Sequence, residues 1–260
     1  MKLARDGIQL SFEIVGAGSP EFLFIHGLGG DRTHFAPQVE YFSRRGRVLN
    51  VELRGHGDSD KPKQQYTIEG FADDICWLCA QQNLKKPVIT GQSMGGNMAL
   101  EIAARYPSFA AGLVLLDSGV LFPASAATVF AGYLEGLKSP DFEAEVRKIV
   151  ADSCLPTDAC RDQVERTFLA TPQHVMVSTF ESLFPWDMHR ARECATTCKA
   201  PVLYLEAAHR LADLDLFARL CPQLVTAKAV GSGHFLSLEV PEQVNAMIDR
   251  FIALWVNAQQ

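Results

Sequence analysis

The sequence has no apolar run of the length that crosses a lipid bilayer. Its first residues, Met-Lys-Leu-Ala-Arg-Asp-Gly, lack the apolar core of a secretory signal peptide. Basic residues are not in excess either, because the chain has 24 Lys and Arg and 30 Asp and Glu. The resulting net charge of -6 disfavours nucleic acids and anionic membranes as partners. We therefore expect a cytoplasmic protein that binds neither a nucleic acid nor a membrane.

Cysteine patterns typical of disulfide frameworks or zinc sites are also missing. Seven cysteines, an odd number, fit a reducing compartment better than a disulfide framework. Cys76 and Cys79 lie in a stretch with helical periodicity, where both sulfurs are expected to pack in the core rather than to act as a redox pair. Cys194 and Cys198 have no His or second Cys pair at zinc-finger spacing. We expect no metal and no cofactor.

The stretch at residues 91–95, Gly-Gln-Ser-Met-Gly, lies between a short apolar run and a run of helix formers that ends before Pro107. Strand, sharp turn and helix in this order form the context of a Gly-x-Ser-x-Gly nucleophile elbow. In such a turn a side chain at Gly91 or Gly95 would collide with the neighbouring strand or helix. Ser93 would stand over a helix N-terminus, whose free N–H groups favour negative charge. The pattern predicts Ser93 as a catalytic nucleophile.

A second glycine-rich loop, His-Gly-Leu-Gly-Gly at residues 26–30, follows the apolar run 22–25. A run that is apolar throughout is typical of a central parallel strand covered on both faces. A loop with three glycines at the end of such a strand can bring backbone N–H groups close to a substrate oxygen. We expect the N–H groups of Leu28 and Met94 to form an oxyanion hole.

Two more loops complete a set of four motifs. Residues 54–59, Arg-Gly-His-Gly-Asp-Ser, follow the expected strand 47–53, and residues 231–235, Gly-Ser-Gly-His-Phe, follow an apolar run near the C-terminus. Over nearly the whole chain, the four motifs in this order resemble the α/β-hydrolase superfamily. The resemblance implies an α/β fold with a mostly parallel eight-stranded sheet and helices on both faces. It also implies that His234 is the general base, whereas His56 is expected to pin its own loop.

The acid is where the sequence departs from the family pattern. Most members carry an Asp after the penultimate strand, in a loop shaped like Gly-x-x-Asp, but here the strand at 201–205 is followed by Glu-Ala-Ala-His-Arg-Leu-Ala-Asp. Three carboxylates could replace the usual one: Glu206, Asp213, or Asp117 at the end of the strand 112–116. Some branches of the superfamily keep the acid in that earlier loop. We therefore prefer Asp117, with Asp213 and Glu206 as alternatives.

Between about residues 118 and 197 the sequence shows helical patterns only, and helices are expected at 124–138, 141–153, 158–169 and 172–184. In the superfamily, an all-helical insertion between the sixth and seventh strands forms a cap above the nucleophile. The chain is thus expected to divide into a core domain of residues 1–118 and 198–260 and a cap of residues 119–197. Apolar cap residues expected to line a substrate pocket are Phe122, Met176, Phe180 and Trp186.

These features predict a hydrolase that acts on a small molecule. We expect its substrate to be a small to medium, largely apolar ester or lactone that is cleaved through an acyl-enzyme. We expect the protein to be a monomer or a homodimer. Ser93 at the elbow argues against haloalkane dehalogenases and epoxide hydrolases, which resemble this fold but place an Asp there. Two alternatives stay open. One is cofactor-independent dioxygenation of a heteroaromatic substrate by a His and an early Asp. The other is a hydrolase-like receptor that binds a ligand without turnover.

Overall fold

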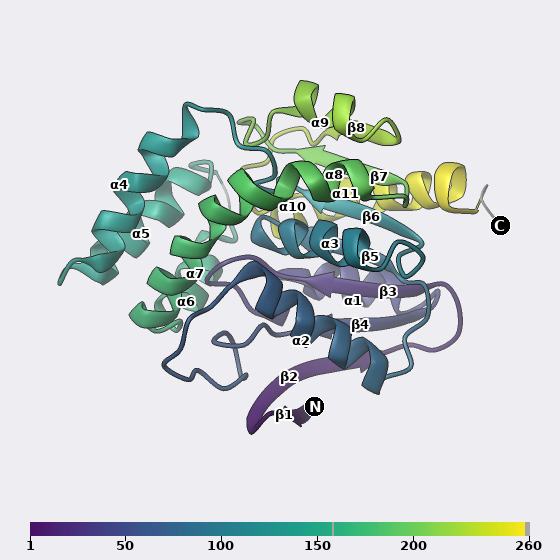
Figure 1. Cartoon of the computed structure of the whole chain (residues 1–260), viewed down its shortest axis with the longest axis horizontal. Coiled ribbons are helices and arrows are strands. Elements are labelled where there is room, and N and C mark those ends of the chain that lie inside the picture. Colours follow the sequence, from purple (N-terminus) through teal and green to yellow (C-terminus); the bar gives the residue numbers. More distant parts are fainter. Residues whose placement is uncertain (158, 258–260) are drawn as a thin grey trace.

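The computed structural model describes residues 1–157 and 159–257. Within these residues the chain forms an eight-stranded sheet in the order β1-β2-β4-β3-β5-β6-β7-β8 (Figure 1). The two pairs that involve β2 are antiparallel and the other pairs are parallel. The strands are β1 (Lys2–Arg5), β2 (Ile8–Val15), β3 (Glu21–Ile25), β4 (Arg47–Val51), β5 (Val88–Gln92), β6 (Gly112–Leu116), β7 (Val202–Glu206) and β8 (Leu224–Lys228).

The strand order creates a topological switch between β3 and β5. The chain leaves β3 to form β4 on one side, and later returns to form β5 on the other side of β3. Open α/β sheets bind ligands outside the carboxyl ends of the strands at such a point. The registers pair Ile25 with Gly91, Gln92 with Leu116 and Leu116 with Leu205, so the loops that follow β3, β5, β6 and β7 begin at the same edge.

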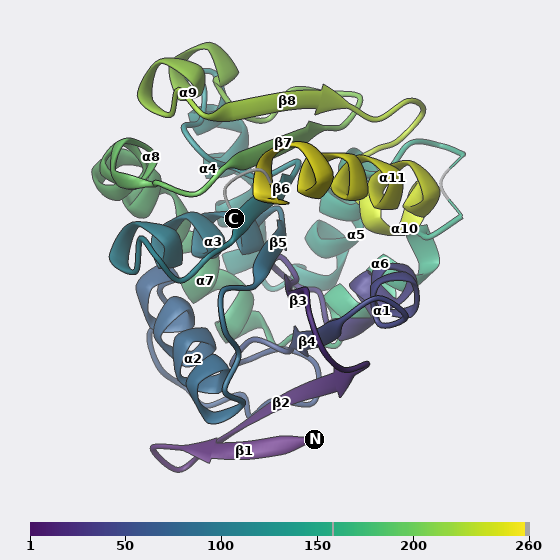
Figure 2. The same cartoon turned by 90° about the vertical axis from the view of Figure 1, so that its right-hand side faces the viewer.

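Helices cover both faces of the sheet (Figure 2). One face carries α2 (Ile68–Gln81), α3 (Met94–Arg105) and α8 (Arg192–Thr197), and the other carries α1 (Ala36–Phe42), α10 (Leu236–Glu239) and α11 (Pro241–Phe251). The sequence prediction of a mostly parallel sheet covered on both sides is confirmed. In α2, burial raises the pKa of Cys76 to about 11 and Cys79 is buried, as a packing role requires.

Four helices between β6 and β7 lie beyond one end of the sheet (Figure 1): α4 (Ala126–Lys138), α5 (Phe142–Ser153), α6 (Arg161–Leu169) and α7 (Gln173–Trp186). The helix predicted at 158–169 begins on a residue outside the described ones, and α6 is described from Arg161. The helix predicted to end at residue 184 instead continues through Pro185 and a π-helical turn (Asp187–Ala191) into α8. Because α8 packs on α3, it covers the sheet rather than the site. The cap boundaries at 119 and 197 stay a prediction.

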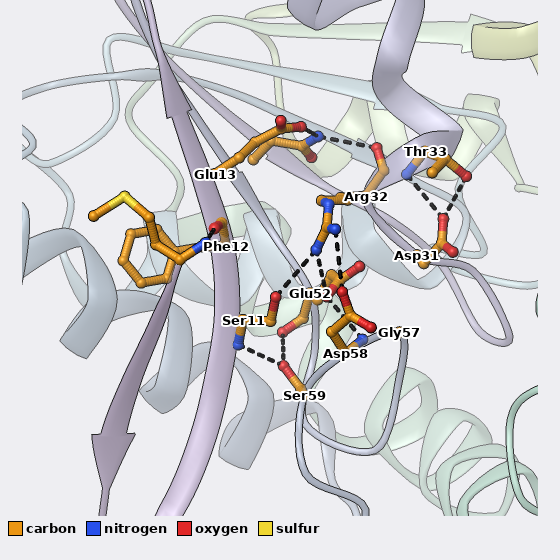
Figure 3. Close-up of polar contacts among 12 residues, drawn as sticks. Ser11, Phe12, Glu13, Asp31, Arg32, Thr33, Glu52, Gly57, Asp58 and Ser59 are labelled. Atoms are coloured by element: carbon orange, nitrogen blue, oxygen red, sulfur yellow. Dashed lines mark hydrogen bonds and ion pairs between the residues drawn. The ribbon is translucent and has the colours of Figure 1, made fainter.

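Arg32 joins three segments below the loop that follows β3 (Figure 3). Its guanidinium forms an ion pair with the buried Glu52 at 3.0 Å and hydrogen bonds to Ser11 Oγ and Asp58 Oδ2, both at 3.1 Å. These partners come from β2 and from the segment after β4, so the contacts fix the end of the loop at residues 26–31 against the antiparallel side of the sheet. Among the described residues, no helix is both long and apolar enough to cross a membrane.

Candidate active site

Ser93 stands on a strained turn between β5 and α3. Its backbone has φ 53° and ψ −124°, a conformation that costs energy for any residue with a side chain. The turn is closed tightly by two glycines. A Cβ at Gly91 would overlap the backbone of Gly95, and a Cβ at Gly95 would overlap the carbonyl oxygen of Ile25 in β3. The reason given for both glycines in the elbow motif is thus confirmed at atomic level.

Asp117 and His234 are brought together from the ends of β6 and β8. His234 Nδ1 donates to Asp117 Oδ2 at 2.7 Å. The Asp117 side chain is 5% exposed and the His234 side chain 18% exposed, so the pair is largely shielded from water. Of the three carboxylates considered from the sequence, Asp117 is the one that meets His234.

The loop after β7, where the family resemblance led us to expect the acid, has a different role in this structure. Ala207 directly follows β7, and its backbone N–H approaches Asp117 Oδ1 at 3.4 Å, while the backbone N–H of Asp117 donates to Leu205 O at 2.8 Å. The start of the loop after β7 therefore supports a carboxylate that belongs to the neighbouring strand. The side chain that the family pattern leads one to expect after β7 is replaced by a backbone donor.

The other two candidate acids have partners elsewhere. Asp213 caps the helix α9 (Leu214–Leu220), because its carboxylate accepts from the backbone N–H of Leu216 at 2.9 Å. Glu206 forms an ion pair with Arg210 at 3.1 Å. Neither has a hydrogen bond to His234 among the interactions of the described residues.

The His234 loop is held from two sides by residues that sequence reasoning did not select. The backbone N–H of His234 donates to Ser153 O in the last turn of α5 at 2.9 Å. Gln92, which directly precedes Ser93, donates from Nε2 to the carbonyl oxygen of His234 at 3.1 Å. Gln92 occupies a variable position of the elbow motif, so the motif carried no signal for this contact. The same residue therefore precedes the nucleophile and fixes the loop of the general base.

The loop that carries Leu28 is pinned by His26. The backbone N–H of Leu53 donates to His26 Nε2 at 3.1 Å, so Nδ1 carries the proton and donates to Gly27 O at 2.8 Å. Burial lowers the pKa of His26 to about 4, and the ring is therefore neutral at physiological pH. Met94 opens α3, where the first backbone N–H groups have no partner within the helix. Both predicted oxyanion donors thus belong to fixed backbone next to Ser93.

A cavity of about 540 Å³ lies over these residues. Its walls include Ser93, Asp117 and His234, together with Leu28 and Met94. The remaining lining is mainly apolar and comes from the cap helices and from the loops after β6, β7 and β8. Aromatic residues in it are Phe122, Phe130, Tyr133, Phe168, Phe180 and Phe235. A cavity of this size accommodates a small to medium organic molecule.

Two of the four predicted pocket residues, Phe122 and Phe180, line the cavity, whereas Met176 and Trp186 do not. Met176 is fully buried within the cap core. Trp186 faces α3 instead, and its Nε1 donates to Glu101 Oε2 at 2.9 Å. Both side chains are buried, but α7 has one apolar side toward the cavity and another toward α2 and α3.

The hydrogen bond to Glu101 in α3 orients the Trp186 side chain toward the sheet. Glu101 is fully buried and also accepts hydrogen bonds from Arg105, Arg190 and Cys194. Burial alone would raise the pKa of this carboxyl group, but the four donors hold it at about 2. Glu101 therefore stays ionised and requires its donors, which fixes the position of the Trp186 ring.

Comparison with known proteins points to one family. A family model described as alpha/beta hydrolase fold matches residues 20–241. The AB hydrolase superfamily protein YisY of Bacillus subtilis is 27% identical, over 95% of this chain and 96% of that protein. The solved enol-lactonase from Burkholderia xenovorans is 22% identical with a TM-score of 0.86, over 97% of this chain and 100% of that one.

Other curated relatives match over a shorter stretch. An uncharacterized Mycobacterium tuberculosis protein is 32% identical over 113 residues, which are 44% of this chain and only 33% of that protein. The match to this chain therefore covers only about a third of that relative's length.

Proposed function

Because the chain belongs to the alpha/beta hydrolase fold family, we propose that it is a serine hydrolase that cleaves a carboxylic ester or lactone. The observation that carries the proposal is the 2.7 Å hydrogen bond from His234 Nδ1 to Asp117, at a cavity that Ser93 also lines. A histidine held in this tautomer has its other nitrogen, Nε2, available as a base.

The proposed reaction passes through an acyl-enzyme. Ser93 Oγ attacks the carbonyl carbon and its proton passes to His234 Nε2, which then gives the proton to the leaving alkoxide. Water then attacks the acyl-enzyme, with His234 again as the base. Asp117 holds the imidazole in the required tautomer and stabilises its cation without becoming protonated. The negative charge on the substrate oxygen is stabilised by the N–H groups of Leu28 and Met94.

The cavity favours a largely apolar substrate of small to medium size. Phe122, Phe130 and Phe180 contribute apolar wall in the cap, and the volume of about 540 Å³ lies within the range of small-molecule sites. By analogy of fold, the similarity to a solved enol-lactonase is consistent with a lactone as well as an open ester. We propose an uncharged ester or lactone, and a protein that acts as a monomer or homodimer in the cytoplasm.

The first test compares the wild type with two serine variants on a short-chain p-nitrophenyl ester and on a simple lactone. We expect Ser93→Ala to lose nearly all turnover. Ser125→Ala is a matched control, because Ser125 lines the same cavity on an exposed turn and has no side-chain cap hydrogen bond. It should keep wild-type kcat.

Hydrolysis that survives in Ser93→Ala would overturn the proposal. Oxygen uptake with a hydroxyquinolone-type substrate, retained in Ser93→Ala, would instead favour dioxygenation by His234 and Asp117. Tight binding of a ligand without any product in the wild type would favour a receptor.

A further inference from the structure

Two cysteines and a glutamate meet outside the proposed active site. Cys154 is the C-cap residue of α5, Cys160 is the N-cap residue of α6, and Glu239 is the last residue of α10. One sulfur or oxygen atom from each of the three lies within 4.8 Å of the other two. Among the described residues, this is the one group of three His, Cys, Asp or Glu side chains that converges in this way.

The spacing of these atoms matches one edge of a tetrahedral metal site. Zinc binds thiolate sulfur at about 2.3 Å and carboxylate oxygen at about 2.0 Å, so two such ligands on a tetrahedral ion lie about 3.5 Å apart. The distance between Cys160 Sγ and Glu239 Oε1 is 3.6 Å. Cys160 and Glu239 would therefore need little movement to bind one ion, and Cys154 lies within 4.8 Å of both.

The carboxylate of Glu239 is already oriented toward the sulfur of Cys160. Its other oxygen, Oε2, accepts from Ser232 Oγ at 2.8 Å and from the backbone N–H of Gly233 at 2.5 Å. Such hydrogen bonds to the second oxygen are the usual way in which a protein fixes a ligating carboxylate. The remaining oxygen, Oε1, is the one that contacts Cys160.

The electrostatics of the group also suit a cation. Two thiolates beside a carboxylate would repel one another strongly in this partly buried place, and a divalent cation would remove that repulsion.

We propose that Cys154, Cys160 and Glu239 form a binding site for a divalent cation that prefers thiolate ligands, of which Zn²⁺ is the representative. Binding exchanges two protons for the ion: both thiols lose H⁺, both sulfurs bond to the cation, and Glu239 supplies the third ligand. Water takes the fourth position. No oxidation or reduction is involved.

The site would tie the cap to the His234 loop. Cys154 follows Ser153, whose carbonyl accepts from the backbone N–H of His234, and Glu239 accepts from the backbone N–H of Gly233 just before it. An ion on the three ligands would add a further connection between the end of α5, the start of α6 and this loop. Since the ion binds the folded chain, it should also raise the thermal unfolding temperature.

The test measures metal binding by the chelator-treated, full-length protein under a phosphine reductant, with no activity assay. Zn²⁺ binding is followed by calorimetry and Co²⁺ binding by its thiolate-to-metal charge-transfer absorption. We expect one ion per chain, a charge-transfer band, and an unfolding temperature that rises with Zn²⁺. The variants Cys154→Ser and Cys160→Ser should bind at least about 100-fold more weakly and lose the band, and Glu239→Gln should bind about tenfold more weakly.

Cys221→Ser is the matched control. Cys221 pairs with Cys198 through their thiols. Among the described residues, no third His, Cys, Asp or Glu side chain converges on this pair. The control should bind Zn²⁺ like the wild type. A protein that binds no ion, or whose Zn²⁺ affinity is unchanged in Cys154→Ser and Cys160→Ser, would overturn the proposal. Loss of binding in Cys221→Ser alone would place the ion at the other pair and would overturn it as well.

Discussion

Asp117 has a backbone φ of 40°, in the left-handed region that Asp and Asn tolerate better than most residues. Ser93 and His234 could be selected from the sequence because each lies in a short motif with its own local geometry. The acid could not be selected in the same way. Its assignment depends on the pairing of Leu116 with Leu205, which sets the ends of β6 and β7 side by side. That register is a long-range property that no local pattern contains.

The assignment of the acid predicts a large and specific loss in Asp117→Asn. The amide keeps the size of the side chain but cannot stabilise the imidazolium, and it favours the wrong tautomer of His234. We expect kcat to fall by about 10³–10⁴ with little change in KM. Steady-state kinetics on a p-nitrophenyl ester measure this effect.

Asp213→Ala serves as its control. This variant removes the N-cap hydrogen bond of α9 and should cost about 1 kcal/mol of stability while kcat stays near the wild-type value. If the kcat losses of the two variants were reversed, Asp213 would be the acid.

The positions of Phe122 and Trp186 predict different kinetic consequences. Phe122 lines the cavity and stacks on Phe184, with ring centroids 5.0 Å apart, so Phe122→Ala should raise KM about tenfold for a longer acyl chain and less for acetate.

Trp186→Phe should leave KM unchanged and cost about 1–2 kcal/mol of stability, because Glu101 loses one of its donors. Chain-length series and urea denaturation separate the two effects. A KM change in Trp186→Phe equal to that in Phe122→Ala would contradict the structure.

At the scale of elements, periodicity predicted which segments form helices but not all of their ends. The helix after the elbow begins at Met94 with Ser93 as its N-cap residue, which agrees with the expectation that Ser93 stands over a helix N-terminus. The end predicted at residue 184, by contrast, is wrong. Pro185 removes one backbone donor and normally stops a helix, yet here the following π-helical turn carries the helix on to α8. Burial of Ala191 and Cys194 against α3 stabilises this continuation.

Two glycines in helices predict opposite effects of the same substitution. Gly95 lies in the first turn of α3, where a Cβ would overlap the carbonyl oxygen of Ile25, so Gly95→Ala should cost about 3 kcal/mol or more, or prevent folding. Gly132 lies within α4 and a Cβ there meets no atom within 4 Å, so Gly132→Ala should stabilise the protein by about 0.5–1 kcal/mol. Urea denaturation measures both. A Gly95→Ala variant of wild-type stability would contradict the tight contact between β3 and α3.

At the scale of the whole molecule, the cap is joined to the core by contacts that lie far apart in the sequence. His34 Nε2 donates to Thr167 Oγ1 at 2.9 Å, and Gln163 Nε2 donates to Thr33 Oγ1 at 3.1 Å. Contacts of this kind decide which side of each cap helix faces the cavity. Sequence patterns mark a helix side as apolar but not what it packs against, which is why Phe180 was placed correctly and Trp186 was not.

Three histidines are buried in the protein, and burial is the main cause of their lowered pKa values. It lowers the pKa of His26 and of His34 from 6.5 to about 4, and that of His56 from 6.5 to about 3. The unfolded chain, in which these groups titrate near 6.5, therefore binds more protons than the folded chain between pH 6.5 and about 4. In this window each histidine makes the folded state less stable as the pH falls, and above about pH 6.5 the effect is absent.

His34→Gln isolates the contribution of one such group while keeping a side-chain donor toward Thr167. Each histidine contributes up to about 1.4 kcal/mol per pH unit to the slope of unfolding free energy against pH. Urea denaturation at pH 7, 6 and 5 should therefore show a wild-type stability that falls with acidification, and a slope in His34→Gln that is shallower by about that amount. Because the carboxylates titrate alike in both proteins, the difference in slope reports the histidine alone. Equal slopes would mean that folding does not lower the pKa of His34, and that the junction between the loop after β3 and α6 admits water.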